Sequence, residues 1–393
     1  MNILFLLNEP DPRMTHFGGA QRTNAIWRAL QKLGDVYTMT FDQRFETREV
    51  APRLWYVKKL QKVNPIRDFF YKVQTFFWRK LRVLYCFPLA TKIEKTADEI
   101  FPNIKFDVVV CRYLDVLGEM HLWGHPRLIV DVDDDPLQMY DTVKSHNLHP
   151  LSRKIGRWIL QRQVTFLEKK IAGGWLSNPA QVNCIHFRSG VFALSNIAKS
   201  PSSKYRYESH RNSAAIIVGS MSYLPNYEGV SSFLNTVWPI FYEKYPEIKL
   251  QIVGAGTFPE YKERWNKYPN VEQLGFVQDI EIVYQNCLCS IVPINLGGGT
   301  CIKTIEAMSF GRVCLASPFG ARGLEDCIKS KNTGLQIFQS AEEFIQKFET
   351  YVLEKNNREI AEKEAVSYIM TTHSESHFFQ VVRDTVLKIR ENR

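Results

Sequence analysis

The sequence predicts an α/β protein of two domains, each a doubly wound parallel sheet with helices on both faces. Short apolar runs alternate with amphipathic helical patterns along the chain. Most of these runs are uniformly apolar rather than alternating, which is typical of strands that helices cover on both faces. The length of 393 residues matches two domains, at roughly 100–200 residues per domain.

Seven short apolar runs are the expected strands. They are Ile3–Leu7, Asp107–Cys111, Leu128–Val132, Ala214–Val218, Leu250–Val253, Leu288–Val292 and Val313–Ala316. Apolar residues spaced three and four apart predict helices over residues 160–171 and 230–241, and a further helical pattern covers residues 375–389. A polar stretch with one proline and several serines places the domain boundary within residues 198–212.

The formal net charge of +9 is unevenly distributed along the chain. Residues 1–200 contain 29 basic and 19 acidic side chains, whereas residues 201–393 contain 21 and 22. The cysteines form no CxxC pair and several lie in apolar runs, which indicates reduced thiols. The first apolar run is too short for a signal peptide, and no stretch approaches the roughly 20 apolar residues of a spanning helix. We therefore expect a cytoplasmic protein without a transmembrane segment.

Two glycine-containing loops follow expected strands. Gly18 and Gly19 stand between the first strand and a helical pattern, where backbone amides and the helix dipole favour an anion such as pyrophosphate. A plain tight turn explains this loop equally well. Gly219 and Ser220 follow a strand at the equivalent position of the second domain, but a glycine after a strand is more often only a turn.

The most informative loop is Gly297-Gly298-Gly299-Thr300, which leads from a strand into a helical pattern. Three glycines before a helix cost conformational entropy without a gain in packing, so the close approach of a ligand explains them. Thr300 can cap the helix. Lys303, one turn on, can lean back toward the same anion, and Glu306, one turn further, can accept hydrogen bonds from a ribose diol. The alternative is a capped helix with a surface Lys–Glu pair, worth only a few tenths of a kcal/mol.

At these residues the chain resembles family 4 glycosyltransferases, which have the GT-B fold of two doubly wound Rossmann-like domains facing across a cleft. Several spaced matches follow the family's order over most of the C-terminal half. They are Gly297–Thr300, Lys303, Glu306-Ala307-Met308, Gly311 and Gly320…Gly323-Leu324 in the pattern "GGGTR.K..EAMA.G…G..GL", Ile252–Gly256 in "vGdGp", Asn270–Asp279 in "nV.flGfv.D", and Thr372–Glu375 in "f.we".

The resemblance implies that residues 210–372 bind a nucleotide-sugar donor and residues 1–200 an acceptor, with a helix over 373–393 that crosses back to the N-terminal domain. Phe276 and Val277 would lie near the base, Glu306 at the ribose and Lys303 at the diphosphate. The donor-binding residues that it implies are Gly18, Gly19, Gly219, Ser220, Asn226, Phe276, Val277, Gly298, Gly299, Thr300, Lys303 and Glu306.

In its C-terminal half the chain departs from the family pattern at two places, and Asp133 in the N-terminal half is a third departure. Gly298 stands where the first glutamate of the family's Glu-x7-Glu would lie, so Glu306 alone is left for the ribose. Ser220 and Asn226 stand where an Arg and a Lys are usual. The diphosphate charge is then left to Lys303, to the glycine amides and to helix termini.

An aspartate cluster, residues 131–135, follows the strand Leu128–Val132. Asp133 stands where the family commonly has a histidine near the reacting sugar. We expect His16, Asp133 and Lys303 to be catalytic, and Arg112 and Asp133 to face the acceptor. Alternatively, Asp131 and Asp133 bind a divalent metal through carboxylate oxygens, or the cluster is a solvated turn with a helix-capping aspartate.

A basic and aromatic segment covers residues 51–88, with nine basic side chains, one acid and ten interleaved aromatics. This composition resembles an interfacial membrane helix, with cations for anionic headgroups and aromatics for the acyl boundary. A second basic run over residues 153–162 extends it. Alternatively, the aromatics face the domain core, or the cations bind nucleic acid, although no base-reading motif accompanies them. The candidate membrane residues are Lys58, Lys59, Lys62, Arg67 and Trp78.

Together these features predict an enzyme that transfers a sugar from a UDP- or GDP-sugar to a saccharide or lipid-linked saccharide acceptor. The expected setting is the assembly of cell-surface polysaccharide or glycoconjugate, at the inner face of an anionic membrane. The resemblance implies retention of anomeric configuration and no cofactor or metal. A metal-dependent Asp-x-Asp transferase and a nucleic-acid-binding protein that uses the basic N-terminal half are the alternatives.

Overall fold

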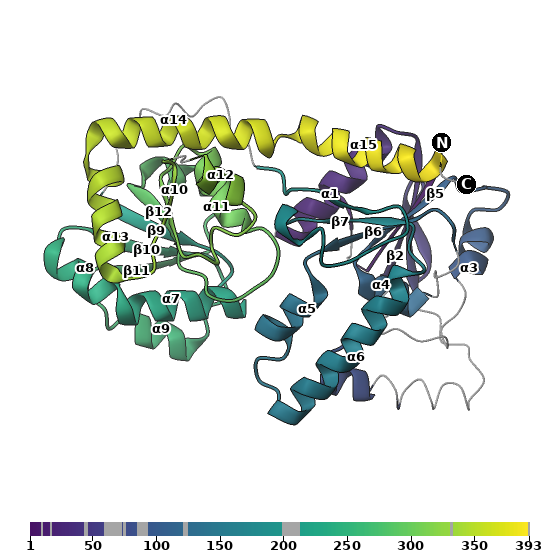
Figure 1. Ribbon diagram of the computed structural model, residues 1–393, viewed down its shortest axis with the longest axis horizontal. Helices are drawn as coiled ribbons and strands as arrows, with labels where there is room; N and C mark the ends of the chain where they lie inside the picture. The colour runs from purple at the N-terminus through teal and green to yellow at the C-terminus, as the bar shows by residue number, and fades with distance from the viewer. Residues whose placement is uncertain are drawn as a thin grey trace. The chain divides into compact units, whose positions relative to one another are not determined.

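A computed structural model describes residues 1–8, 11–15, 18–42, 46–58, 73, 76–84, 93–120, 125–198, 213–330 and 333–391. The chain divides into two compact units (Figure 1). The N-terminal unit contains Met1–Ser195 and Glu375–Arg393, and the C-terminal unit contains Asn196–Ser374. Most of the stretch in which the sequence predicts the boundary, residues 199–212, lies outside the described residues.

The N-terminal unit is built on an eight-stranded sheet with the order β3-β4-β2-β1-β5-β6-β7-β8. All neighbouring strands are parallel except β3 and β4, a hairpin at one edge. The strands are β1 (Asn2–Leu7), β2 (Asp35–Asp42), β3 (Arg48–Ala51), β4 (Leu54–Lys58), β5 (Val108–Arg112), β6 (Leu128–Asp133), β7 (Gly173–Leu176) and β8 (Val191–Ala193).

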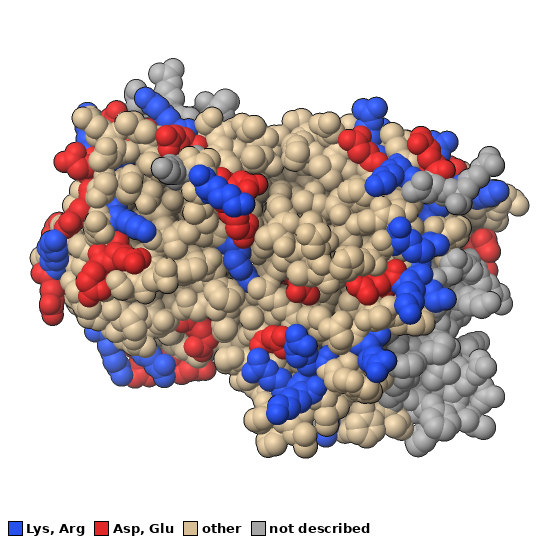
Figure 2. Space-filling view, in the orientation of Figure 1, with Lys and Arg blue, Asp and Glu red and all other residues tan. Residues whose placement is uncertain are grey.

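The helices of this unit come from both ends of the chain. They are α1 (Gly18–Gln31), α3 (Ile93–Ile100), α4 (Leu114–Met120), α5 (Pro136–Met139), α6 (Pro150–Glu168) and α15 (Glu375–Glu391), with short helical turns at Tyr140–Lys144 and Pro179–Gln181. The C-terminal helix α15 lies against α1, where Glu375 pairs with Arg28 at 2.8 Å. It also accepts a hydrogen bond at Thr385 from the buried indole of Trp175. Lys and Arg side chains gather over α6 at the lower edge of Figure 2.

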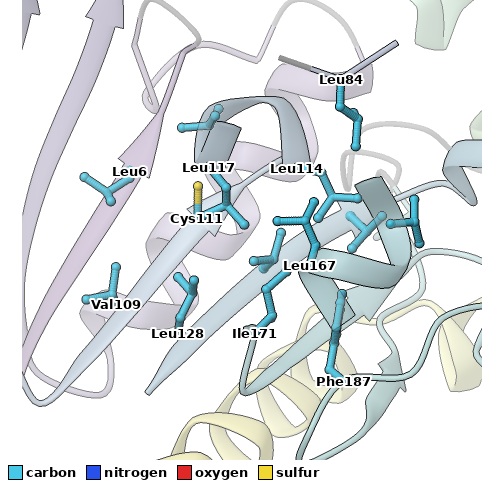
Figure 3. Close-up of a cluster of buried hydrophobic side chains, with 14 of the residues drawn as sticks. Leu6, Leu84, Val109, Cys111, Leu114, Leu117, Leu128, Leu167, Ile171 and Phe187 are labelled. Atoms are coloured by element: carbon cyan, nitrogen blue, oxygen red, sulfur yellow. The ribbon is translucent and has the colours of Figure 1, made fainter. Parts of the chain in front are cut away.

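The core of the N-terminal unit lies between the sheet and the helices α4 and α6 (Figure 3). Alternate side chains of β1, β5 and β6 point into it, as the two-residue period of a strand requires. The labelled side chains are Leu6, Val109, Cys111 and Leu128 from the strands, Leu114 and Leu117 from α4, Leu167 from α6, and Leu84, Ile171 and Phe187 from connecting segments.

The C-terminal unit is built on a six-stranded, fully parallel sheet with the order β11-β10-β9-β12-β13-β14. Such a sheet with β9 at its centre is the doubly wound arrangement, which collects loops at the carboxyl ends of the strands. The strands are β9 (Ala214–Val218), β10 (Lys249–Val253), β11 (Val271–Gly275), β12 (Cys289–Val292), β13 (Cys314–Ala316) and β14 (Leu335–Ile337).

The helices of the C-terminal unit cover both faces of its sheet. Consecutive residues of one strand enter opposite cores: Ala215 and Ile217 face one apolar cluster, and Ile216 faces the other. The helices are α7 (Leu224–Thr236), α8 (Trp238–Lys244), α9 (Pro259–Trp265), α10 (Ile280–Asn286), α11 (Ile302–Ser309), α12 (Glu325–Lys329), α13 (Ala341–Phe348) and α14 (Lys355–Thr372), with a π-helical turn at Glu349–Leu353.

The seven strands predicted from the sequence are all present, each within one residue of the predicted ends. One predicted helix is divided. The pattern over residues 230–241 falls on α7 and α8, which break at Val237 because Pro239 cannot donate a backbone hydrogen bond and starts a new helix instead.

Candidate active site

The loops after β9 and β10 meet through glycine backbones. Gly254 has a φ of +139°, and a side chain there would place its Cβ 1.8 Å from the carbonyl oxygen of Gly219. The Gly219 amide donates to Val253 and the Met221 amide to Ala255, which ties the two loops together. The close packing of the two backbones therefore explains why glycine stands at position 254 in the pattern Ile252–Gly256.

Gly219 lies under two polar side chains. A Cβ at position 219 would lie 2.6 Å from Cε of Lys303 and 2.8 Å from Nδ2 of Asn226. Lys303 is half-buried on α11, and Asn226 is buried near the start of α7. Both side chains thus come within 3 Å of one point above Gly219. The structure brings together three residues that the sequence assigns to the donor, from three different elements.

Asn226 is only partly satisfied by its neighbours. Its Nδ2 donates to the carbonyl oxygen of Ser220 at 2.6 Å, which fixes the amide plane. Its buried Oδ1 has no hydrogen-bond donor among the described residues. A buried acceptor without a donor costs about 1–3 kcal/mol, so a ligand or the Lys303 ammonium is the natural partner of this oxygen.

The glycine loop is held by a residue that the sequence analysis missed. Arg322 donates to the carbonyl oxygens of Gly297 at 2.7 Å and Gly298 at 3.0 Å. Because the C=O and N–H of one planar peptide point in opposite directions, the amides of Gly298 and Gly299 point away from Arg322. Gly297 adopts a φ of +127° and Gly299 a φ of +57°, which favour glycine at both positions. Arg322 falls inside the motif Gly320…Gly323-Leu324, so its place in the sequence was a usable signal.

The helix α11 begins one residue later than predicted. Its N-cap is Cys301, without a side-chain hydrogen bond, so the capping role expected of Thr300 is wrong. Thr300 is buried against Gly323, where a Cβ would lie 2.1 Å from its hydroxyl oxygen. The first amides of α11 and the side chain of Lys303 nevertheless come from the same turn, where the helix dipole favours an anion.

Glu306 is oriented by a buried tyrosine. The hydroxyl of Tyr284 donates to Oε2 of Glu306 at 3.1 Å, and its ring stacks on Phe310 with centroids 4.8 Å apart. Burial, together with the charge of Glu306, holds the pKa of Tyr284 well above its usual range, so the hydroxyl stays a donor. Glu306 itself is half-buried, one turn beyond Lys303. Nothing in the motif indicates Tyr284, which lies on α10.

Phe276 and Val277, assigned to the base, lie on the loop that follows β11. Phe276 is 78% exposed, the highest fraction among the large hydrophobic side chains that the structure describes as exposed. Val277 is half-buried. An aromatic ring this exposed beside a strand end is suited to contact a flat ligand. The assignment of Phe276 and Val277 to the nucleotide base stays a proposal.

In the N-terminal unit, the ends of β5 and β6 carry a buried network of four charged side chains. Arg22 donates to both carboxylate oxygens of Asp131, at 2.7 and 2.9 Å. Arg112 donates to Asp131 and, at 2.9 Å, to Asp133. Two guanidiniums and two carboxylates balance one another, as burial requires. The sequence analysis did not identify Arg22, which follows the Gly18-Gly19 loop by one helical turn.

Asp133 is the member of this network that reaches solvent. Its side chain is 19% exposed, whereas those of Arg22, Arg112 and Asp131 are 2% or less. Asp133 is the last residue of β6, and a bulge between Asp131 and Asp133 together with a φ of +69° interrupts the regular strand backbone there. Burial alone would raise the pKa of Asp133, but the guanidiniums of Arg112 and Arg22 outweigh it and hold this pKa below its usual range. Asp133 is therefore a carboxylate that can accept hydrogen bonds from a ligand.

The expectation that Arg112 faces the acceptor is corrected by the structure. Its side chain is fully buried, and its guanidinium is taken up by Asp131, Asp133 and neighbouring hydroxyls. Arg112 positions Asp133 instead. The same contacts argue against a metal held by Asp131 and Asp133, because the carboxylate oxygens already accept from guanidinium groups that would repel a cation. Asp135 caps α5 by accepting a hydrogen bond from the amide of Leu137, as expected for a helix-capping aspartate in this cluster.

Only some of the other predicted site residues of this unit belong to the described part of the chain. Gly18 and Gly19 form the first turn of α1, after a strand as expected. His16, Lys59, Lys62 and Arg67 lie outside the described residues. Lys58 is exposed at the end of β4. Trp78 is corrected: it is half-buried and packs against the core, whereas its neighbours Phe76 and Phe77 are more than half exposed.

Comparisons with known proteins agree with this architecture. Residues 213–353 match the family model described as "Glycosyl transferases group 1". The chain is 22% identical over 247 residues to a Klebsiella pneumoniae protein described as "Uncharacterized 44.6 kDa protein in cps region". That match covers 60% of this chain and 63% of the relative, less than two thirds of its length.

Solved structures share the fold along nearly the whole chain. WaaG, "a glycosyltransferase involved in lipopolysaccharide biosynthesis", is similar with a TM-score of 0.61 and 13% identity, covering 99% of this chain and 100% of that one. Anabaena Alr3699/HepE in complex with UDP and glucose is similar with a TM-score of 0.63 and 13% identity, covering 98% and 99%.

The comparisons show the fold of the chain and a family match for part of it. The predicted GT-B fold of two doubly wound α/β domains is confirmed by the two parallel sheets and these structures. The match of residues 213–353 to the glycosyltransferase group 1 model agrees with the predicted enzyme class in this part of the chain. Membership of the family 4 subgroup stays a prediction.

Proposed function

We propose that the protein transfers a sugar from a UDP- or GDP-activated donor to a saccharide or lipid-linked saccharide acceptor. The observation that carries this proposal is the convergence of Lys303, Asn226 and the loop Gly297–Gly299 at the carboxyl ends of β9 and β12. Amides, one ammonium group and a helix N-terminus at one place are suited to a diphosphate. Glu306, oriented by Tyr284, offers carboxylate oxygens to a ribose diol from the next turn of the same helix.

The proposed chemistry rests on the leaving diphosphate. As the bond between the sugar and the diphosphate breaks, negative charge grows on the leaving oxygen. Preorganised donors that face this oxygen lower the barrier without rearranging. Lys303 and the amides of Gly298 and Gly299 supply such donors, and Arg322 fixes the position of the glycine loop. This arrangement supports a transfer without a metal cofactor, and retention of anomeric configuration is proposed from the family resemblance.

On the acceptor side we propose Asp133 and His16 as the groups that contact the acceptor sugar. Asp133 supports this role because it is the exposed carboxylate of an otherwise buried network. The relative in a "cps region" and the similarity to WaaG, a protein of lipopolysaccharide biosynthesis, support a place in cell-surface polysaccharide or glycoconjugate assembly. Such an acceptor would be met in the cytoplasm, at the inner face of the membrane.

The test is the binding of UDP and GDP, measured by isothermal titration calorimetry on the full chain. We expect one nucleotide to bind, and Lys303→Ala to weaken it by roughly 10- to 100-fold, since hydrogen bonds to charged groups contribute about 1.5–3 kcal/mol. Lys329→Ala is the matched control, because Lys329 is an exposed lysine of the same unit. Unchanged binding by Lys303→Ala, with an intact circular dichroism spectrum, would refute the proposed site.

The choice between a metal-free and a metal-dependent transferase needs a separate measurement. We expect donor hydrolysis or transfer to proceed undiminished in EDTA. Activity that disappears in EDTA and returns with Mg²⁺ or Mn²⁺ would instead favour the Asp-x-Asp alternative.

A further inference from the structure

The helix α6 has two apolar faces, although only one of them packs against the protein. Leu160, Val164 and Leu167 are buried in the core between α6 and the sheet. Leu167 is seen pointing into this cluster in Figure 3. A surface helix normally presents polar side chains on the opposite side.

The opposite side of α6 is instead an exposed stripe of large apolar residues. Its members are Leu151, Ile155, Trp158 and Phe166, with exposed fractions of 61%, 44%, 62% and 48%. Their spacing of four, three and eight residues keeps them on one face of an α-helix, about half a turn away from the buried face. Leu151, Ile155 and Trp158 are neighbours on this face, and Phe166 lies about two turns beyond Trp158 with Arg162 between them, which is more than the single exposed residues that are normal on a surface.

Basic side chains flank this stripe. Lys154 is exposed beside it, whereas Arg162 lies within the stripe, between Trp158 and Phe166, with its guanidinium over the ring of Trp158 at 5.5 Å. Arg153 and Arg157, also exposed, contact Asp141 of the preceding turn. The only acid in α6 is Glu168, at its last residue. The blue side chains at the lower edge of Figure 2 show this gathering of positive charge.

A second aromatic element lies beside α6. The helical residues 76–81 run into a segment whose Leu84 carbonyl oxygen accepts a hydrogen bond from the buried amide of Gln163. Gly156 admits the ring of Tyr140 and this segment, because a Cβ there would lie 1.9 Å from the hydroxyl oxygen of Tyr140 and 3.0 Å from the carbonyl oxygen of Leu81. Phe76 and Phe77, 54% and 55% exposed, thus belong to the same region, with Lys80 over the ring of Phe76 at 4.5 Å.

We propose that the exposed face of α6, with Phe76 and Phe77, is a docking surface for an anionic lipid bilayer. An apolar stripe rich in Trp, Phe and Leu, rimmed by Lys and Arg, matches a helix that lies in the membrane interface. The charge complementarity selects this occupant, because a protein partner or a second copy of this chain would not by itself require a rim of cations. None of the helices in the part of the chain that the structure describes is long and apolar enough to cross a membrane, so the contact is one of surface docking.

This surface overlaps the segment that the sequence emphasised at Phe76 and Phe77, but its main element is α6, which contains the second basic run. Lys58 lies on a strand and Trp78 faces the core, whereas α6 carries the apolar side chains that would enter the headgroup region. The inference deepens the membrane-side location proposed above but does not depend on the transfer reaction. Vesicle binding and nucleotide binding are therefore measured separately.

The experiment is cosedimentation of the full chain with vesicles of phosphatidylcholine, with and without phosphatidylglycerol. We expect binding to the anionic vesicles that weakens with salt, as screened charges require. Lys154→Gln/Arg162→Gln should lower the partition coefficient about 25-fold, at roughly fivefold for each cation. Ile155→Gln/Trp158→Gln should lower it at least about tenfold through lost apolar burial.

Matched controls come from the C-terminal unit. Ile240→Gln/Ile360→Gln removes two exposed isoleucines, and Lys267→Gln/Lys355→Gln removes two exposed lysines. Both should bind vesicles like the wild type, and all four double variants should keep their affinity for UDP or GDP. Equal loss in the control and α6 variants, or no binding of the wild type to anionic vesicles, would overturn the proposal. A dimer in solution that Ile155→Gln/Trp158→Gln dissociates, without vesicle binding, would show that a second copy covers this face instead.

Discussion

The two units place different chemistry at the carboxyl ends of their central strands. In the N-terminal unit, Arg22 and Arg112 are locked onto Asp131 and Asp133, and the charges balance within the protein. In the C-terminal unit, the same region of the sheet carries glycine amides, a buried amide oxygen without a donor and Lys303. The first arrangement balances its charges internally and exposes only Asp133 in part, whereas the second leaves several polar groups for a ligand.

This difference shows why charge alone is a poor guide to a binding site. All excess positive charge of the sequence lies in residues 1–200, yet two arginines of that half, Arg22 and Arg112, are buried and paired. The donor site is proposed in the half that is nearly neutral, because amides and one cation at a helix start bind an anion without a large net charge. The excess charge of the N-terminal half is accounted for in part by the surface of α6.

The largest effect should follow from opening the closed network. Asp131→Ala leaves two buried guanidiniums without their shared partner, and we expect a loss of about 3–5 kcal/mol in the free energy of unfolding. Hydrogen exchange followed by mass spectrometry should show the loss in β5 and β6 and not in β9 and β12. Asp98→Ala, an exposed aspartate on α3, is the control and should change neither. Equal destabilisation by the two variants would show that the network does not hold this unit together.

A methyl group should disturb the open site without destabilising the fold to the same degree. Gly219→Ala places a Cβ 2.6 Å from Cε of Lys303 and 2.8 Å from Asn226. Lys303 must therefore move, and we expect nucleotide affinity to fall by roughly 10- to 100-fold, the range given for a lost charge-assisted hydrogen bond. Titration calorimetry measures the effect. Lys329→Ala, the exposed lysine of the same unit used above, is the control and should keep wild-type affinity. If Gly219→Ala bound the nucleotide with wild-type affinity, Lys303 would not be part of the binding site.

Acid should weaken the closed network through Asp133. The pKa of Asp133 is lower in the folded protein than in the unfolded chain, so its contribution to stability is present above the unfolded value of about 3.9 and lost as the pH falls below it. Asp133→Asn should cost about 1–2 kcal/mol near neutral pH, as for a lost hydrogen bond to a charged group. Urea titrations of the two proteins should converge as the pH drops below about 4. A constant difference down to the lowest accessible pH would contradict this account.

The smallest effect should come from the residue that orients Glu306. Tyr284→Phe keeps the stacked ring and removes the hydrogen bond, which contributes about 1 kcal/mol. We expect UDP or GDP, whichever binds, to bind about fivefold more weakly, and the corresponding 2′-deoxynucleotide to be affected less because it lacks one ribose hydroxyl. Equal weakening of both nucleotides would mean that Tyr284 acts through the packing of α11 and not through the ribose.

The fold could be predicted from the sequence where strands are continuously apolar. All seven predicted strands, such as Ala214–Val218, are central and covered on both faces. The strands that were missed are short, edge-lying or interrupted by polar residues. β2 carries Thr38 and Thr40, and β7 consists of Gly173-Gly174-Trp175-Leu176, where Gly174 is required because a Cβ would lie 2.4 Å from the ring of Phe187. Here the glycine is required by a side chain that is distant in the sequence, and no local pattern predicts such a strand.

By itself, the sequence determined the two doubly wound domains and the glycine loop with Lys303 and Glu306. The periodicity of apolar residues and the spacing of glycines are properties of short stretches of chain and can be recognised there. Only the tertiary structure decided which polar groups are available. It buried Arg112 behind Asp133 and brought Arg322 to the glycine loop and Tyr284 to Glu306. It also packed Trp78 against the core while leaving Trp158 exposed. Charge pairing and burial depend on contacts between residues distant in the chain, and such contacts exist only after the sheets have formed.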